Sequence, residues 1–149
     1  MKFAHTNIIA RDWKKLSRFY QNVFGCKPVG FRRDLSGEWL DQLTGLKNAH
    51  LYGEHLALPG YDSIEPTLEI FSYDEIIGEN DASINHTGIR HIAFEVEDID
   101  IVLQKVLQEG GEQLGKKVTK EYPNNKCATF LYIKDIEGNI IELQNWKEL

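Results

Sequence analysis

The two halves of the 149-residue chain carry the same landmarks in the same order. Each half has a histidine in a strand-like segment, an aspartate seven residues later that can cap a helix, a glycine twenty residues after the histidine, and a later strand with an embedded glutamate. The landmarks are His5, Asp12, Gly25 and Glu69 in the first half and His91, Asp98, Gly111 and Glu142 in the second. This duplication constrains the fold more than any single motif, because both halves must then share one strand–helix–strand–strand–strand order.

Hydrophobic periodicity predicts the elements of each half. In the first half we expect strands over 3–10, 28–33, 49–58 and 67–72, a helix over 13–25, and a short helix over 36–46 capped by Ser36. In the second half we expect strands over 88–96, 117–121, 128–134 and 140–144, a helix over 99–109, and a hairpin turn over 135–139. Residues 74–88 are polar and aperiodic, so they predict a linker between modules at 1–73 and 89–149.

Composition and charge exclude several classes of protein. Hydrophobic residues make up 42% of the chain and charged residues 27%, which is ordinary for a globular protein. The net charge of −6 argues against broad nucleic-acid or anionic-membrane binding. The two cysteines, Cys26 and Cys127, form no disulfide framework or zinc motif, and we find no targeting or membrane-spanning segment. We therefore expect a cytoplasmic protein whose partner is a small molecule.

Strand alternation separates the repeated histidines and glutamates from the apolar residues beside them. His91 is out of phase with Ile92 and Phe94, and Glu69 lies between Leu68 and Ile70. The same holds for His5 in the first strand and for Glu142 in the last. All four residues should therefore face away from the helices, and they would converge on the concave face if the sheet curls.

Two imidazoles and two carboxylates that converge would form a site for one divalent metal ion, such as Zn, Ni, Co, Mn or Fe. A carboxylate surrounded by leucine and isoleucine is costly to ionise unless a positive charge lies nearby. Taken singly, a histidine in such a strand is more often a hydrogen-bonded core residue than a metal ligand, and a glutamate there is often a residue on a solvated face. The repeat favours a joint site, because the same two residue types recur at matched places.

Four segments, 5–9, 16–25, 88–96 and 135–143, resemble the vicinal oxygen chelate superfamily, which includes glyoxalase I, methylmalonyl-CoA epimerase, extradiol dioxygenases and bleomycin or fosfomycin resistance proteins. The resemblance implies an α+β fold. In it, two βαβββ modules form a curved, U-shaped mixed sheet with helices on its convex side. It also implies one metal ion held by His5, Glu69, His91 and Glu142, with Glu142 as catalytic base and Glu69 as its near-symmetric partner.

The ligand set narrows the choice within the superfamily. It is similar to that of bacterial glyoxalase I, whereas extradiol dioxygenases usually lack the carboxylate at Glu69 and the epimerases typically have Gln there. The Arg and Asn that bind glutathione in glyoxalase I are replaced by Ile9 and Tyr73. We therefore expect a homodimeric, metal-dependent lyase or isomerase that acts on another small α-hydroxycarbonyl or an acyl thioester through a metal-stabilised enediolate.

Two other functions stay open: a non-catalytic binding protein of the bleomycin-resistance type, and an iron-dependent extradiol dioxygenase. Several residues are weaker candidates for substrate contact, namely Asn7, Arg32, Arg33 and Lys126. The helix that contains residues 38–41 is a possible lid or pocket wall. His50, His55 and His86 have no counterpart in the repeat, so we interpret them as structural.

Overall fold

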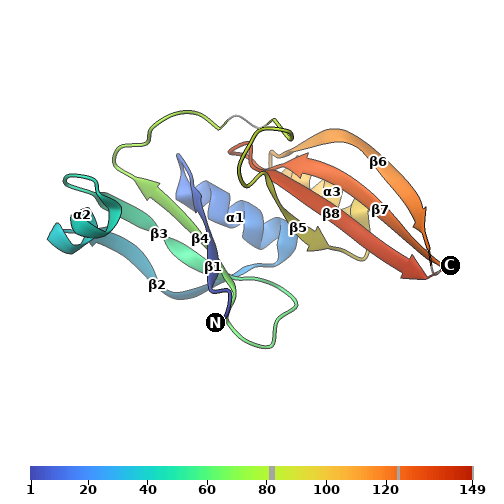
Figure 1. Cartoon of the computed structure of the whole chain (residues 1–149), viewed down its shortest axis with the longest axis horizontal. Helices are drawn as coiled ribbons and strands as arrows, with labels where there is room; N and C mark the ends of the chain where they lie inside the picture. The colour runs from blue at the N-terminus through green and yellow to red at the C-terminus, as the bar shows by residue number, and fades with distance from the viewer. Residues whose placement is uncertain (81–82, 124, 149) are drawn as a thin grey trace. The chain divides into compact units, whose positions relative to one another are not determined.

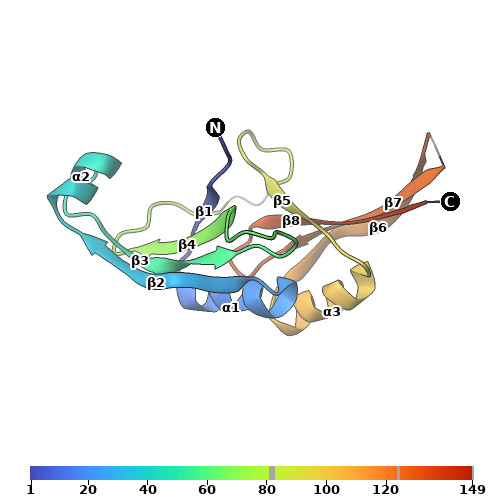
Figure 2. The ribbon, with the colours of Figure 1, turned by 90° about the horizontal axis from the view of Figure 1, so that it is seen from below.

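Each half of the chain forms a four-stranded mixed sheet with a helix against one face (Figures 1 and 2). The computed structural model describes residues 1–80, 83–123 and 125–148. It divides into two units, Met1–Gly78 and Glu79–Leu149. Both units have the βαβββ order, so the predicted α+β class built from two such modules is confirmed.

The first unit contains β1 (His5–Ile9), α1 (Trp13–Phe24), β2 (Lys27–Ser36), α2 (Glu38–Thr44), β3 (His50–Ala57) and β4 (Thr67–Tyr73). Its strand order is β1-β4-β3-β2, in which β1 and β4 are parallel and the other pairs antiparallel. Helix α1 packs against β3 and β4. In Figure 2, α1 and α2 lie on opposite sides of this sheet.

The second unit contains β5 (His91–Glu95), α3 (Ile99–Gln108), β6 (Glu112–Tyr122), β7 (Lys126–Lys134) and β8 (Ile140–Glu148). Its strand order, β5-β8-β7-β6, repeats that of the first unit. Strands β2, β6 and β8 run further than the sequence predicts, because their ends are polar and carry little periodic signal. The described residues of 74–88 form no helix or strand.

The predicted aspartate caps are present in both units. Asp12 Oδ1 accepts hydrogen bonds of 3.1 Å from the backbone N–H groups of Lys14 and Lys15, and Asp98 caps α3 in the same way. Gly25 ends α1 with a φ of 71°, a left-handed conformation that favours glycine. The prediction for Ser36 is wrong: Ser36 ends β2, and Gly37 takes the N-cap position of α2 without a side-chain cap.

Apolar side chains between helix and sheet form the core of each unit. In the first unit they include Leu16, Phe19, Tyr20, Leu56, Leu68 and Ile70, and in the second Val106, Leu131, Ile133, Ile141 and Leu143, all of them buried. Burying a side chain of this size contributes about 1.5–3 kcal/mol. Because this burial anchors β4 and β8 from the helix side, their alternate residues must point to the opposite face. Among the described residues, no helix is long and apolar enough to cross a membrane.

Candidate metal centre

The first sheet brings His5, Asn7 and Glu69 together on the face away from α1. Asn7 lies directly opposite Glu69 in the parallel β1–β4 ladder, and its Nδ2 donates a 3.3 Å hydrogen bond to Glu69 Oε2. His5 Nε2 lies 3.4 Å from the same oxygen. The Glu69 side chain is only 11% exposed, and Asn7 and His5 both contact its Oε2.

His55 joins this group, although sequence analysis interpreted it as structural. It lies opposite Glu69 in the antiparallel β3–β4 ladder, and its Nε2 is 3.1 Å from Glu69 Oε1. Its ring also contacts Phe71, with 5.7 Å between ring centroids. Burial lowers the pKa of His55, and the positive charge of Arg33 acts in the same direction, while the Glu69 carboxylate opposes both. The histidine–glutamate repeat does not contain His55, because its place beside Glu69 follows from the cross-strand register rather than from spacing along the chain.

The second sheet forms a corresponding pair from His91 and Glu142. His91 Nε2 lies 3.1 Å from Glu142 Oε2, and the two side chains are 34% and 18% exposed. Tyr132 lies opposite Glu142 in the β7–β8 ladder, and its ring centroid is 5.3 Å from that of His91. Burial and the Glu142 carboxylate both raise the pKa of Tyr132. This unit therefore repeats the arrangement of the first, with an aromatic residue in place of His55.

The donors in each pair are of the types that bind divalent transition metals, an imidazole nitrogen and a carboxylate oxygen. Within each unit, the described side chains of His, Cys, Asp and Glu form no group of three or more that could hold a metal ion. Each unit instead brings one imidazole and one carboxylate together, His5 with Glu69 or His91 with Glu142. The donor types of each pair fit a divalent transition metal.

The two neighbouring arginines point to different places. Arg33 pairs with Gly53 in the β2–β3 ladder, which places it on the face of His55, and its guanidinium lies 4.3 Å from the Phe31 ring centroid. Arg32 lies on the α1 side instead, with its Nε 3.8 Å from Glu54 Oε2. Of these two arginines, Arg33 therefore shares a face with the His5–Glu69 pair. Lys126 lies at the start of β7, opposite Glu148.

A cavity of about 410 Å³ lies between α1 and β2, on the face opposite His5 and Glu69. Glu54, the acidic residue of its lining, already has partners. Glu54 is buried, and it accepts a hydrogen bond from Ser17 and lies beside Arg32, whose guanidinium lies 5.7 Å from the Trp13 ring centroid. This cavity is therefore separate from the candidate metal centre.

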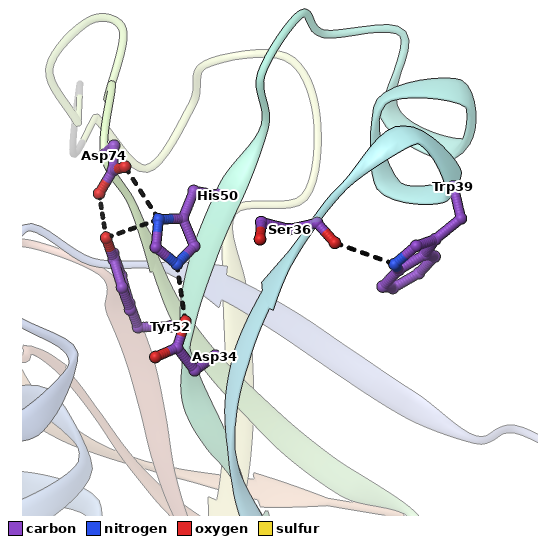
Figure 3. A network of polar contacts seen from close by, with 6 residues as sticks. All are labelled: Asp34, Ser36, Trp39, His50, Tyr52 and Asp74. Atoms are coloured by element: carbon purple, nitrogen blue, oxygen red, sulfur yellow. Dashed lines mark hydrogen bonds and ion pairs between the residues drawn. The ribbon is translucent and has the colours of Figure 1, made fainter.

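His50 belongs to a second polar network, on the α1 side of the first sheet (Figure 3). Its Nε2 lies 2.6 Å from Asp34 Oδ1, and its Nδ1 lies 3.1 Å from Asp74 Oδ2. The Tyr52 hydroxyl donates to Asp74, which helps to raise the pKa of Tyr52 to about 12. The network connects β2, β3 and the end of β4, as expected of a structural histidine.

Helix α2 packs on the same face of the first sheet as Glu69. Its Leu40 is buried with Ala49 and Leu51, and Phe71 and Tyr73 pack against this cluster. Phe71 also contacts His55, so apolar contacts run from α2 to the histidine–glutamate group. Figure 3 shows Trp39 donating a 3.0 Å hydrogen bond to the Ser36 carbonyl, which holds the start of α2 against the end of β2. Helix α2 therefore packs against the sheet through Leu40, and its role as a lid or pocket wall stays a prediction.

The corresponding face of the second sheet is aromatic beyond Glu142. Alternation along β8 places Trp146 on the face of Glu142. Its ring centroid lies 5.1 Å from that of Tyr122 and 5.8 Å from that of Phe130. We call these three residues the aromatic cluster.

Residues 2–143 match the family model of the Glyoxalase/Bleomycin resistance protein/Dioxygenase superfamily. A stretch of 57 residues is 37% identical to an ethylmalonyl-CoA/methylmalonyl-CoA epimerase from Cereibacter sphaeroides. This match covers 38% of the chain and 42% of the epimerase, so the chain spans less than half the length of that relative.

Solved structures share the fold over nearly the whole chain. A glyoxalase family protein from Bacillus cereus has a TM-score of 0.82 at 23% identity, covering 98% of this chain and 94% of its own. The fosfomycin resistance protein FosX from Listeria monocytogenes has a TM-score of 0.58 at 16% identity, covering 97% and 90%. Another FosX structure contains Mn(II) and 1S,2S-dihydroxypropylphosphonic acid, so at least one protein with this fold binds a divalent metal.

Proposed function

Because the chain belongs to the Glyoxalase/Bleomycin resistance protein/Dioxygenase superfamily, we propose that it is a divalent-metal-dependent lyase or isomerase. Its substrate would be a small α-hydroxycarbonyl compound or an acyl thioester. The observation that carries this proposal is the duplicated pair: His5 faces Glu69 at 3.4 Å in one sheet, and His91 faces Glu142 at 3.1 Å in the other.

The proposed ligands are these four side chains, two from each unit. A divalent ion bound by them would polarise the substrate's oxygens and so make the adjacent C–H bond more acidic. We propose Glu142 as the general base that takes this proton, a step worth roughly 10²–10⁴-fold in rate. Glu142 is suited to the task because its side chain is partly exposed and His91 lies within contact distance of its Oε2.

The partial match to an acyl-CoA epimerase favours an isomerase that acts on an acyl thioester. Arg33 would bind a negatively charged group of such a substrate, since it lies on the face of Glu69. The aromatic cluster would contact an apolar or planar part of it. We further propose that the protein is a cytoplasmic homodimer. Analytical ultracentrifugation would measure the mass of the particle in solution.

The closest alternative is a binding protein without turnover. Purification without chelator, followed by metal analysis, separates the two functions. The enzyme should retain about one divalent ion per chain, and this ion should be lost in His5→Ala and His91→Ala. A screen in D₂O would then measure deuterium incorporation into α-hydroxycarbonyls and acyl-CoA thioesters. Metal-free protein that binds such compounds without exchange would exclude the lyase or isomerase, and oxygen uptake with catechols would indicate a dioxygenase.

A further inference from the structure

Glu69 and Glu142 occupy the same position in the two sheets, yet they are held differently. Both oxygens of Glu69 have partners, His55 on Oε1 and Asn7 with His5 on Oε2. In the described part of the chain, Glu142 contacts His91 through Oε2. The first carboxylate is therefore fixed at both oxygens, and the second at one.

His55 is placed to fix the orientation of Glu69 without competing for the same oxygen as His5. It contacts Oε1 from β3, whereas His5 and Asn7 contact Oε2 from β1. A neutral imidazole protonated at Nε2 donates its N–H to Oε1, a charge-assisted hydrogen bond to a carboxylate. The contact with the Phe71 ring restricts how far the imidazole can rotate away.

We propose that His55 is a positioning residue that fixes Glu69 as a stationary metal ligand and so leaves proton transfer to Glu142. The proposal rests on the proposed function, because it assumes that Glu69 binds the metal. Hydrogen-bond donors to ligating carboxylates orient the ligand, and their loss typically costs 10–100-fold in metal affinity. His55 would act through Glu69 rather than as a ligand itself, since its Nε2 faces Oε1, whereas His5 of the repeated pair contacts Oε2.

The test measures Co²⁺ binding to metal-free full-length protein by calorimetry and by the visible absorption of bound Co²⁺. His55→Phe removes the donor and keeps a ring beside Phe71, so we expect 10–100-fold weaker Co²⁺ binding and an altered spectrum. His55→Gln keeps an N–H donor on a flexible side chain. Its Co²⁺ affinity and its spectrum should therefore lie between those of His55→Phe and those of the wild type. His55→Ala serves the same purpose if the phenylalanine variant does not fold.

His50→Gln is the matched control, because His50 lies on the same strand, faces the other side of the sheet and also contacts carboxylates. We expect it to bind Co²⁺ with wild-type affinity and spectrum. Circular dichroism in the absence of metal would confirm that each variant is folded.

Glu69→Ala, which removes the ligating oxygens altogether, distinguishes failure of this proposal from failure of the proposed function. If Glu69→Ala weakens Co²⁺ binding while His55→Phe or His55→Ala binds it as the wild type does, the positioning role is wrong and the metal site stands. If Glu69→Ala itself binds Co²⁺ unchanged, Glu69 is not a ligand and both proposals fail. The positioning role would also be wrong if His55→Gln and His55→Phe lost Co²⁺ affinity equally while the spectrum of bound Co²⁺ stayed that of the wild type.

Discussion

The two sheets have one register but different surroundings for the carboxylate at its centre. In the first sheet Glu69 lies between Asn7 and His55, and in the second Glu142 lies between Ala93 and Tyr132. The histidine–glutamate pair is thus repeated while both flanking positions differ. A duplicated backbone can keep the donors that a metal needs and still give its two acids different freedom to move.

The difference extends to both faces of the sheets. On the helix side, Ser17 and Glu54 of the first unit form a buried polar pair, where the corresponding positions of the second carry Leu103 and Leu131. On the other face, Arg33 corresponds to Val118, which pairs with Phe130 of the aromatic cluster. The first sheet is therefore the more polar of the two, and the second is the more apolar.

The largest expected effect concerns the two acids. Glu142→Gln should reduce metal-dependent proton exchange by about 10²–10⁴-fold, because an amide cannot accept the proton. It should leave most of the metal bound, since an amide oxygen can still act as a ligand. Exchange measured by mass spectrometry in D₂O, together with metal content, tests this expectation. If Glu142→Gln keeps full proton-exchange activity, Glu142 is not the base. If the variant loses metal but keeps its rate per bound metal ion, Glu142 is the fixed ligand and Glu69 is the base.

The buried pair of the first unit provides the next test. Ser17→Ala removes the hydroxyl donor of a buried carboxylate, so we expect the free energy of unfolding to fall by about 1–3 kcal/mol. The double variant Ser17→Leu/Glu54→Leu copies the second unit and should recover most of that loss, because apolar replacement of a buried polar pair is often neutral. Urea unfolding measures both values. A double variant less stable than Ser17→Ala would show that the polar pair cannot be exchanged for the apolar one.

A smaller effect is expected from the arginines. Arg33→Ala should raise KM for an anionic substrate about tenfold, equivalent to one charge-assisted hydrogen bond of roughly 1.5 kcal/mol, with little change in kcat. Arg32→Ala is the matched control, because the neighbouring arginine pairs with Glu54 on the other face. Steady-state kinetics on an acyl thioester with a free carboxylate would test the difference. Equal KM values for the two variants would place the anionic group elsewhere.

The element order was predictable from sequence because it depends on local signals. Asp12, Asp98 and Gly25 fix helix ends through their own side chains or backbone conformation, and the 135–139 turn forms around Asp135, whose Oδ1 accepts from the N–H groups of Glu137 and Asn139. The common face of His5 and Glu69 follows from alternation along each strand. Ser36 was misjudged because a strand end and a helix cap favour the same residue type.

His55 was missed for a different reason. Its role depends on which residue of β3 lies opposite Glu69, and this register is set by contacts across the sheet rather than by spacing along the chain. The opposite directions of Arg32 and Arg33 follow from alternation, but their faces could be assigned only once the irregular pairing between Val29 and Arg33 was known. The two histidine–glutamate pairs, which belong to the repeat, were therefore predictable from sequence, and the contacts that differ between the halves were not.

The smallest expected effect concerns His50, the histidine of the first sheet that faces away from the candidate centre. Hydrogen bonding to Asp34, together with the charge of Asp74, raises the pKa of His50 above its ordinary value of 6.5. Stabilisation by the protonated imidazole is therefore fully present below pH 6.5 and is lost as the pH rises through the raised pKa. The pKa of Asp74 is lowered below its ordinary value of 3.8. The stabilisation that its carboxylate gives is therefore lost only in acid, as the pH falls through that lowered pKa.

The difference in Tm between the wild type and His50→Gln should thus be greatest at mildly acidic pH and shrink toward alkaline pH. Thermal unfolding of metal-free protein at low salt, measured across this range, provides the comparison, because these exposed charges are screened by added salt. His55→Gln should lack this alkaline decline, since burial lowers the pKa of His55. A pH-independent Tm difference for His50→Gln would mean that the network acts through neutral hydrogen bonds. His50 and His55 would then differ only in the face of the sheet on which they lie, and not in how their charge affects stability.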